Sequence, residues 1–532
     1  MNKKTVDVLI IGAGFAGLYM LYKTRQLGLS AVVVEAGNNV GGTWFWNRYP
    51  GARCDVESME YSFEFSKELQ QEWDWPERFS AQPDILEYIN HVADRFELRS
   101  DIQFNTRVNA CHYDEQNVIW TTTTADTVFT SQFVVAATGC LSQPMTPNIQ
   151  GIETFTGKTY HTGKWPHEGV DFSGKKVAVI GTGSSAVQSI PIIAEQAEHL
   201  TVFQRTPAYS IPARNRTLAT EEKDKIKSTY DALRAKNKTR YLGAGGLYLD
   251  NQTPMSEQNE QEREAMLEYF WEVGGLLFML SYPDLLLDQA TNEYAAEFVR
   301  KKIVAKINDP VLAKKLTPRG TIASKRLCSD TGYYETFNRD NVSLVDASDA
   351  AIQEITETGI KTTEELLEFD AIVLATGYDA MTGALTNIDI RGTDNASIKE
   401  KWEDHVSSYL GIQVAGFPNL FTVACGVGSQ TVLTNVVKSI EHHVEWVSDC
   451  LAHMQANSLR SIQATHEAEL EWTAQVNEIA DTTLFADADS WYTGANVEGK
   501  TKEFAPFIGG FPVYRELCDE AVKNNYHGFA LS

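Results

Sequence analysis

The chain has 532 residues, too many for a single hydrophobic core, and its 43% hydrophobic and 22% charged residues are ordinary for a soluble globular protein. Its net charge of −25 opposes nonspecific binding to nucleic acid or to anionic membranes, so we expect neither as a partner. The seven cysteines include no Cys-x-x-Cys pair, which argues against a metal site or a dithiol redox centre and favours a reducing compartment. No apolar run reaches the length of a membrane span, and we predict a cytoplasmic protein without an obligate protein partner.

A glycine-rich turn lies close to the start of the chain. An apolar strand runs into Gly12, Gly14 and Gly17 follow, and the next apolar strand ends at Glu35. Glycines at this spacing let the backbone approach a pyrophosphate at the N-terminus of a helix, which we place at residues 14–27. A carboxylate at the end of the second strand accepts hydrogen bonds from ribose hydroxyls and repels a 2′-phosphate. This unit predicts a site for FAD.

The stretch after this unit, residues 41–55, is rich in glycine and aromatic residues and has neither strand nor helix periodicity. Loops of this kind lie against flat ligands, although a surface loop with aromatic side chains tucked into the core is the alternative. Further along the chain we predict an amphipathic helix at 84–96, a β-hairpin within 104–128, a strand at 418–424 and a helix at 435–451.

A second unit repeats the pattern of the first. Another apolar strand runs into Gly181, Gly183 follows, and the next strand ends at Arg205. Here the residue that faces the ribose is a cation, which suits a 2′-phosphate and predicts NADPH. Two ordinary βα turns are the alternative, but the paired acid and base at equivalent positions argue against it.

Two apolar strands end in the same Thr-Gly pair, at Thr138-Gly139 and at Thr376-Gly377. A buried parallel strand followed by a glycine turn explains each one alone, and two nucleotide-binding domains explain why there are two. Between residues 218 and 315 the composition shifts to Glu, Lys, Ala and Gln with helical spacing, which indicates a helical insertion.

The predicted fold class is therefore α/β, with two Rossmann-like dinucleotide-binding domains, one for FAD and one for NADPH, and a helical insertion in the NADPH domain. The predicted boundaries are 1–150 for the first part of the FAD domain, 151–217 for the first part of the NADPH domain, 218–322 for the insertion, 323–380 for the second part of the NADPH domain and 381–532 for the C-terminal part of the FAD domain.

The sequence resembles the type I Baeyer–Villiger monooxygenases, which are class B flavoproteins, and is most similar to their phenylacetone monooxygenase-like members. The family marker Phe-x-Gly-x-x-x-His-x-x-x-Trp-Pro is present as Phe155, Gly157, His161, Trp165 and Pro166. Three further stretches match the family and, with the marker, span most of the chain. They are Gly42, Trp44, Tyr49, Pro50, Gly51 and Asp55; Lys325-Arg326; and Ser490 to Asn496.

The resemblance implies an FAD enzyme that uses NADPH and O2. In this family a C4a-peroxyflavin inserts one oxygen atom next to a ketone carbonyl and gives an ester or a lactone. The peroxy anion and the oxyanion that follows require a fixed cation in a dry site. By resemblance we assign this catalytic role to Arg326, held by Asp55. The alternatives are a flavin-containing N- or S-monooxygenase, which the Trp165-Pro166 pair argues against, and a flavin redox sensor that makes no product.

The resemblance also implies which residues bind the cofactors. For FAD they are Gly12, Gly14, Phe15, Gly17, Glu35, Thr43, Trp44, Asp55, Tyr61 and Val108. For NADPH they are Arg53, Asp55, Gly181, Thr182, Gly183, Ser184, Ser185, Ala186, Gln188, Arg205, Thr206, Lys325, Arg326 and Trp491.

His161 is predicted to act in linking the two domains, with a hydrogen-bonded loop histidine as the alternative. The chain departs from the family at Cys425 to Gln430, where a Gly-Pro segment is expected to line the substrate pocket and proline is missing. Leu433 is expected nearby.

Overall fold

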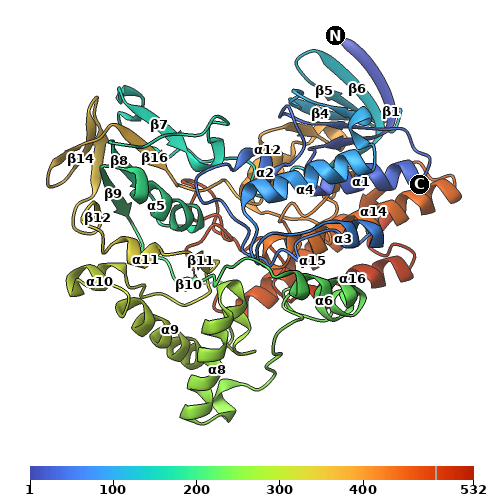
Figure 1. Cartoon of the computed structure of the whole chain (residues 1–532). Helices are drawn as coiled ribbons and strands as arrows, with labels where there is room; N and C mark the ends of the chain where they lie inside the picture. Colours follow the sequence, from blue (N-terminus) through green and yellow to red (C-terminus); the bar gives the residue numbers. More distant parts are fainter. Residues whose placement is uncertain (486–487) are drawn as a thin grey trace.

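The computed structural model describes residues 1–485 and 488–532. It contains two separate parallel-stranded sheets, with a group of helices below them that comes from the middle of the chain (Figure 1). The predicted fold class is confirmed.

The first sheet is built from both ends of the chain in the order β17-β4-β5-β6-β1-β2-β3, with β18 also pairing with β6. Strands β1, β2, β3, β6 and β18 pair in parallel with one another, and β4, β5 and β6 follow each other as an antiparallel meander. The strands are β1 Asn2–Ile11, β2 Ala31–Val34, β3 Ile102–Gln103, β4 Ala110–Asp114, β5 Ile119–Thr123, β6 Thr127–Ala136, β17 Asp389–Arg391 and β18 Leu420–Thr422.

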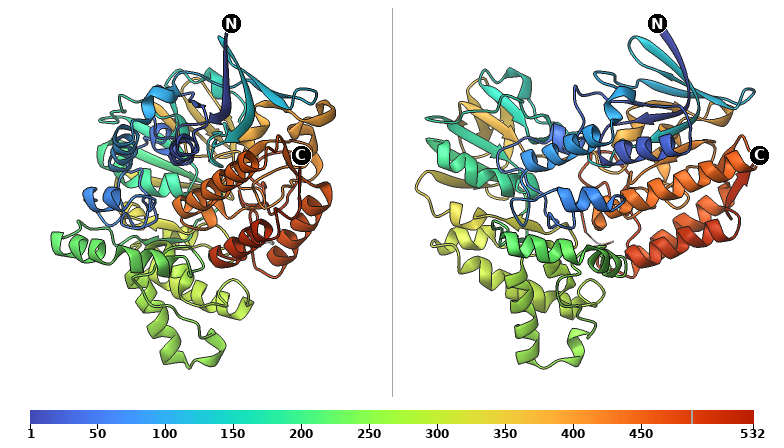
Figure 2. Two further views of the ribbon diagram at one scale, coloured as in Figure 1. Left: turned by 90° about the vertical axis from the view of Figure 1, so that its right-hand side faces the viewer. Right: turned by 45° about the vertical axis from the view of Figure 1, so that its right-hand side comes forward.

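Helices α1 and α14 lie side by side against this sheet, although they are far apart in the sequence (Figures 1 and 2). The helices of this part are α1 Phe15–Gln26, α2 Thr43–Trp46, α3 Lys67–Glu72, α4 Gln82–Arg95, α12 Gly383–Thr386, α13 Ile398–Asp404, α14 Val436–Ala456, α15 His466–Asp481 and α16 Phe511–Lys523. A short antiparallel pair, β19 Ile462–Ala464 and β20 Phe529–Leu531, fixes the C-terminus beside them.

The second sheet has the order β12-β9-β8-β16-β7, and each of its strand pairs is parallel. Its strands are β7 Lys158–His161, β8 Lys176–Ile180, β9 His199–Gln204, β12 Val342–Asp346 and β16 Ala371–Leu374, and its helices are α5 Ser184–Gln196 and α11 Tyr333–Thr336. A three-stranded antiparallel sheet, β13 Ile352–Ile355, β14 Gly359–Thr362 and β15 Leu366–Glu368, extends it.

The central helices are inserted between two short strands, β10 Ser210–Pro212 and β11 Cys328–Asp330, which pair in parallel and bring the ends of the insertion together. The inserted helices are α6 Thr220–Ser228, α7 Tyr230–Asn237, α8 Glu260–Val273, α9 Gln289–Val304 and α10 Pro310–Leu316. Helices α8, α9 and α10 carry apolar side chains into the core of the second sheet, whereas α6 and α7 pack into the core of the first sheet.

Three local predictions need correction. Residues 43–46 form the short helix α2 inside a stretch expected to be irregular. Helix α14 runs to Ala456, five residues beyond the prediction of 435–451, because its buried face continues through Met454. The strand expected at 418–424 is limited to Leu420–Thr422, since Pro418 has no amide proton to donate and Ala424 has a φ of 50°.

The two glycine turns are built alike. Gly12 and Gly181 have φ values of 105° and 115°, and a Cβ on them would lie 2.6 Å from Ala137 O and 2.4 Å from Ala375 O. Ala137 and Ala375 each precede a Thr-Gly pair. The repeated Thr-Gly endings are therefore the places where the neighbouring strand passes directly beneath a glycine turn.

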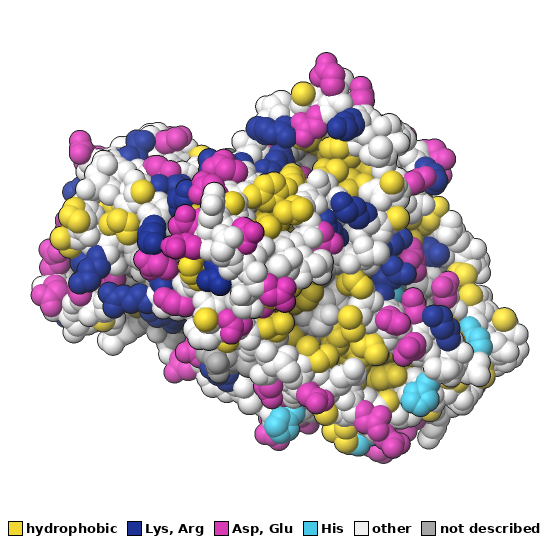
Figure 3. Space-filling model, turned by 90° about the horizontal axis from the view of Figure 1, so that it is seen from below, with side chains coloured by type: hydrophobic (Ala, Val, Ile, Leu, Met, Phe, Trp, Pro, Cys, Tyr) yellow, Lys and Arg dark blue, Asp and Glu magenta, His cyan; other side chains and the backbone are white. Residues whose placement is uncertain are grey.

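The acidic surplus is dispersed on the underside of the molecule, where basic and acidic side chains alternate with apolar ones (Figure 3). Within residues 1–485 and 488–532, no helix combines the length and the apolar character that crossing a membrane requires.

We predict that Gly181→Ala destabilises the protein by about 2–3 kcal/mol, because alanine meets both an unfavourable φ and the oxygen of Ala375. Gly183→Ala is the matched control, since Gly183 has a φ of −80° and no atom within 4 Å of an added Cβ. Chemical denaturation of the two variants measures the difference. Equal stabilities would contradict this account of the turn.

Candidate active site

A continuous cavity of about 1750 Å³ lies between the two sheets and is lined by both glycine turns. The helices that follow the turns, α1 and α5, begin after Gly14 and Gly183, and neither helix has a side-chain cap among the described residues. Their first amide groups therefore lack intrahelical partners at the edge of the cavity. These two helix ends fit the pyrophosphates of two dinucleotides.

The two ends of the cavity differ in charge. Glu35 accepts hydrogen bonds from the amides of Ala13 (2.8 Å) and Gly37 (2.7 Å), and burial raises the pKa of its carboxyl group while these bonds lower it. Arg205 and Lys325 line the other end, and neither forms an ion pair within the described residues. Burial lowers the pKa of Lys325, and the nearby charge of Arg205 lowers it further. Two unpaired cations fit a phosphate.

Most of the residues predicted from the sequence come together at this cavity. They are Gly12, Gly14, Phe15, Glu35, Thr43, Trp44, Arg53, Asp55, Tyr61, Val108, Gly181, Thr182, Gly183, Ser184, Ser185, Gln188, Arg205, Thr206, Lys325, Arg326 and Trp491.

Two predicted residues support the turns from behind and are not among those lining the cavity. A Cβ at Gly17 would lie 1.8 Å from Gly12 O, so only glycine lets α1 pack this closely on its strand. Ala186 occupies the same place in the second unit and is fully buried. Both act on packing, as the third small residue of such a turn does.

The loop after α2 connects the two sheets. The Tyr49 hydroxyl donates to Gln188 Oε1 on α5 (2.8 Å), and Gln188 Nε2 donates to Arg53 O (3.0 Å). A Cβ on Gly51 would lie 2.3 Å from Gln188 O. The guanidinium of Arg53 binds Glu77 and the carbonyl oxygen of Phe79, so its charge is already paired.

Asp55 and Arg326 form the charged centre of the cavity. Arg326 donates from Nε to Asp55 Oδ2 (2.6 Å) and from Nη2 to Asp55 Oδ1 (2.7 Å), and its Nη1 donates to the carbonyl oxygen of Val432. Burial by itself lowers the pKa of Arg326, but the charge of Asp55 outweighs it and raises that pKa above the ordinary value for arginine. The guanidinium stays protonated at every pH at which the protein is folded.

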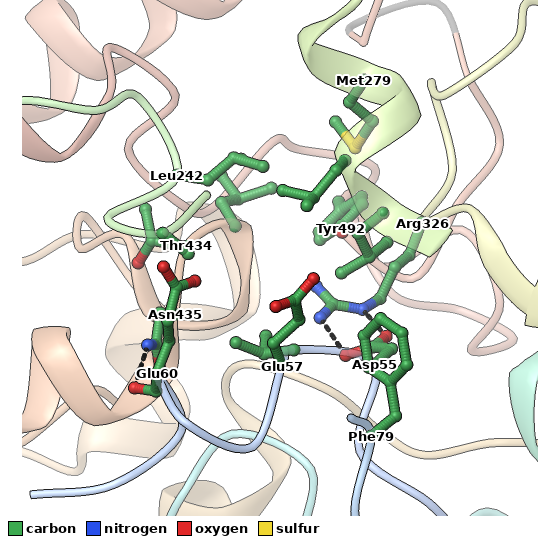
Figure 4. A pocket seen from close by; sticks show the side chains of 15 residues that line it. Asp55, Glu57, Glu60, Phe79, Leu242, Met279, Arg326, Thr434, Asn435 and Tyr492 are labelled. Atoms are coloured by element: carbon green, nitrogen blue, oxygen red, sulfur yellow. Dashed lines mark hydrogen bonds and ion pairs between the residues drawn. The ribbon is translucent and has the colours of Figure 1, made fainter. Parts of the chain in front are cut away.

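A smaller chamber of about 40 Å³ adjoins this ion pair (Figure 4). Apolar side chains form most of its wall, and they come from the loops on either side of α3, from the insertion and from the segment before α14: Val56, Phe79, Leu242, Ala244, Leu276, Leu277, Met279 and Leu433. Its polar lining comes from Glu57, Glu60, Thr434, Asn435 and Tyr492. Burial raises the pKa of Tyr492 to about 12, although Arg326 acts in the opposite sense.

The marker residues lie outside the cavity. Phe155 and Trp165 are buried in the core of the second sheet. His161 Nδ1 accepts from the amide of Gly163 (2.9 Å), which places the proton of the neutral ring on Nε2, where it donates to Met145 O (3.1 Å). Burial lowers the pKa of His161 and keeps the ring neutral.

His161 contacts both segments that cross between the sheets. Met145 lies between β6 and β7, and Thr376, whose Oγ1 is 3.4 Å from His161 Nε2, lies between β16 and β17. Both ring nitrogens are therefore engaged with the crossing segments or with the marker loop.

Sequence reasoning missed the insertion residues and the two glutamates of the chamber. Glu57 and Glu60 follow Asp55 at spacings of two and five, but charged residues at such spacings are ordinary in any loop. Leu242, Leu276 and Met279 reach the site only through the return of the insertion, for which the sequence carries no local signal. Asn435 was predicted as a helix start, and it does cap α14 through Val437 N.

The chain is similar to several known proteins. The pyridine nucleotide-disulphide oxidoreductase family matches residues 9–240. A 2-oxo-Δ3-4,5,5-trimethylcyclopentenylacetyl-CoA monooxygenase from Pseudomonas putida is 40% identical over 99% of this chain and 98% of that protein. A Baeyer–Villiger monooxygenase from Pseudooceanicola batsensis is 38% identical over 99% and 97%, and a phenazine N-monooxygenase from Lysobacter antibioticus is 38% identical over 100% and 98%.

Solved structures agree with these sequence relatives. An oxidised steroid monooxygenase bound to NADP shares 46% identity over 99% of both chains, with a TM-score of 0.95. A structure titled OTEMO in complex with FAD and NADP shares 40% identity over 99% of both chains, also with a TM-score of 0.95. The predicted cofactor pair, FAD and NADPH, is confirmed. The chain belongs to the Baeyer–Villiger monooxygenases, which use FAD and NADPH to insert one oxygen atom of O2 beside a ketone carbonyl.

Proposed function

We propose that the ion pair of Asp55 and Arg326 is the catalytic centre and that a ketone binds beside it. The observation that carries this proposal is a permanently protonated guanidinium at the meeting point of the cofactor cavity and the apolar chamber. Bound FAD and NADPH would supply the redox chemistry, which is hydride transfer to the flavin and activation of O2. The chain itself provides position, charge and a site that excludes water.

Arg326 stabilises the negative charge that develops on an oxygen atom of the reacting group. A guanidinium has five N–H donors, and the described residues engage three of those of Arg326, so two are free for an oxygen of the reacting group. Asp55 and Val432 fix the plane of the guanidinium, which places its charge without a reorganisation cost at the moment of reaction.

The eight-stranded sheet and the glycine turn at Gly12 hold FAD, and the five-stranded sheet with Gly181 holds NADPH. Glu35 accepts from the FAD ribose, while Arg205 and Lys325 bind the 2′-phosphate of NADPH. Trp491 lies over the nicotinamide half or the substrate. We assign the FAD domain to residues 1–150 and 381–532, the NADPH domain to residues 151–217 and 323–380, and the insertion to residues 218–322.

His161 links the domains, because its ring is bonded to both crossing segments and has no nitrogen left to act as a general base. The apolar wall of the chamber favours a neutral ketone as substrate. A cytoplasmic location is supported by the seven cysteines, all of which are free and buried.

Heteroatom oxygenation is the second candidate function, because a relative of 38% identity is a phenazine N-monooxygenase. NADPH consumption measured with a panel of ketones, amines and sulfides, with products identified by mass, decides between them. A ketone monooxygenase forms an ester or lactone in step with NADPH use. A redox sensor without a product shows no substrate-dependent consumption.

We predict that Arg326→Ala lowers the rate of ketone oxygenation by a factor of about 10³ or more, because the fixed positive charge is lost. Rapid-mixing measurements should show flavin reduction by NADPH continuing in this variant. Because the pKa of Arg326 is raised, any loss of oxygenation at high pH in the wild type must come from another group. Normal oxygenation by Arg326→Ala would exclude the proposed role.

We predict that Asp55→Ala destabilises the protein by about 2 kcal/mol, since it leaves the charge of Arg326 without its partner. The value is below that of a fully buried pair because the two side chains keep about a fifth of their exposure, 19% and 21%. The double variant Asp55→Ala/Arg326→Met removes both charges, and denaturant unfolding should find it more stable than Asp55→Ala alone. The opposite order would show that the pair does not hold this region together.

We predict that Arg205→Ala raises the KM for NADPH about tenfold or more and leaves the KM for NADH within twofold, because only NADPH carries the 2′-phosphate. Lys176→Ala, at an exposed lysine on the same domain outside the cavity, is the control and should change neither value. Steady-state kinetics with both cofactors provide the measurement. Equal losses with NADPH and NADH would place the phosphate elsewhere.

A further inference from the structure

The chamber beside Arg326 is closed on one side by a glycine-rich loop, residues 241–249, between α7 and α8. Gly243 and Gly245 have φ values of 63° and 81°, which favour glycine. Leu242 and Ala244, which alternate with them, form part of the chamber wall. We call residues 241–249 the roof loop.

The chamber is small in this conformation. Its volume of about 40 Å³ holds about three water molecules. A ketone with more than a few heavy atoms therefore enters only if part of the wall moves. The roof loop is the part of the wall with the most glycine, and its outer residues Leu247 and Leu249 are exposed, at 44% and 46%.

One buried carboxylate holds the roof loop closed. Glu60 is 1% exposed, and its Oε2 accepts from the amide of Gly245 (2.9 Å) while its Oε1 accepts from Asn237 Nδ2 (3.0 Å). Asn237, on α7, in turn accepts from the amide of Gly246 through Oδ1 (2.8 Å). Two consecutive amides of the roof loop are therefore bound, one by Glu60 and one by its partner.

Glu60 also joins the roof loop to the other walls. It lies five residues after Asp55, and its backbone oxygen accepts from Asn435 Nδ2 (2.8 Å) and from Arg234 on α7 (2.9 Å), as Figure 4 shows for Asn435. Asn435 caps α14 and follows Val432, the residue whose carbonyl oxygen binds Arg326. The loop of Asp55, the roof loop and the start of α14 thus meet at one residue.

We find no role for the charge of Glu60 apart from these hydrogen bonds. Its neighbour Glu57 is paired with Arg78, whereas Glu60 forms no ion pair within the described residues. A buried carboxylate without a cation depends on its hydrogen-bond donors, and a charged acceptor binds them more strongly than a neutral one does. The donors to the Glu60 carboxylate are the amide of Gly245 in the roof loop and Asn237 Nδ2. Opening the loop therefore removes one of the hydrogen bonds that stabilise the charge.

We infer that Glu60 is a positioning residue that latches the roof loop and thereby sets the size of the ketone that the chamber accepts. This inference rests on the proposed function of the chamber. Glu60 does not line the cofactor cavity, so its effect should fall on substrate selection and leave the reaction with NADPH unchanged.

The test compares Glu60→Gln with wild type. A glutamine has one acceptor oxygen, so it cannot accept from both Gly245 N and Asn237 Nδ2, and its amide group faces a donor. Asn237→Ala is the second variant, because it frees the amide of Gly246 and removes one donor to Glu60 while keeping the carboxylate. Glu68→Gln, an exposed glutamate on α3, is the matched control.

Two measurements are made on each FAD-loaded protein. Hydrogen exchange of the peptide that contains residues 241–249 reports the latch without any turnover. Steady-state kinetics with cyclopentanone and with a steroid ketone report the size preference as a ratio of kcat/KM values. Flavin reduction by NADPH without ketone serves as the internal check that the cofactor site is intact.

We expect exchange in the roof loop to be at least tenfold faster in Glu60→Gln and in Asn237→Ala, and the steroid-to-cyclopentanone ratio to rise at least tenfold through KM, with flavin reduction within twofold of wild type. The control should match wild type. If hydrogen exchange of the roof loop is unchanged in the variants, Glu60 does not latch the loop. If exchange is faster but the steroid-to-cyclopentanone ratio is unchanged, the latch does not set substrate specificity. If wild type oxygenates no ketone while NADPH still reduces its flavin, the proposed function fails, and the role in ketone selection fails with it. The exchange result then shows separately whether Glu60 holds the loop.

Discussion

The ion pair between Asp55 and Arg326 joins residues 271 positions apart, and the arrangement of the site depends on it. Either charge alone is costly at this degree of burial, which favours the meeting of the loop after α2 with the segment that precedes β11. The loop is also fastened to α5 through Tyr49 and Gln188. The pair is therefore placed by contacts with both sheets, and a shift of one sheet against the other changes the surroundings of the guanidinium.

The two nucleotide-binding units use the same backbone geometry for two different ligands. In each, a glycine with positive φ lies over an alanine carbonyl oxygen, and the helix that follows begins without a side-chain cap. The difference is confined to the end of the next strand. Glu35 is satisfied there by backbone amides, whereas Arg205 faces Lys325, a second cation. The two units are distinguished by the charge of the ribose-facing side chain, Glu35 or Arg205. The groups around each of these side chains are consistent with that difference.

The sequence is sufficient to predict the turns, the ribose-facing charges and the helix that follows the first turn, because each is set by residues close together in the chain. It does not reveal the chamber. Leu242 and Met279 reach Arg326 through the folding of a long insertion, and helical spacing says nothing about where such an insertion returns. The role of Glu60 could not be predicted for a different reason. Its partners are the amide of Gly245 and the side chain of Asn237 on α7, and any residue type can supply a backbone amide.

Lys325 and Arg326 show why adjacent cations are not interchangeable. Burial lowers the pKa of Lys325, with Arg205 adding to the effect, so this charge is costly until an anion arrives and is well suited to bind one. The pKa of Arg326 is raised instead, because the charge of Asp55, which accepts two parallel hydrogen bonds from the guanidinium, outweighs the effect of burial. A lysine in its place would offer no plane for two parallel bonds and would lose its proton more easily. One residue pair therefore supplies a charge that awaits a ligand and a charge that never changes.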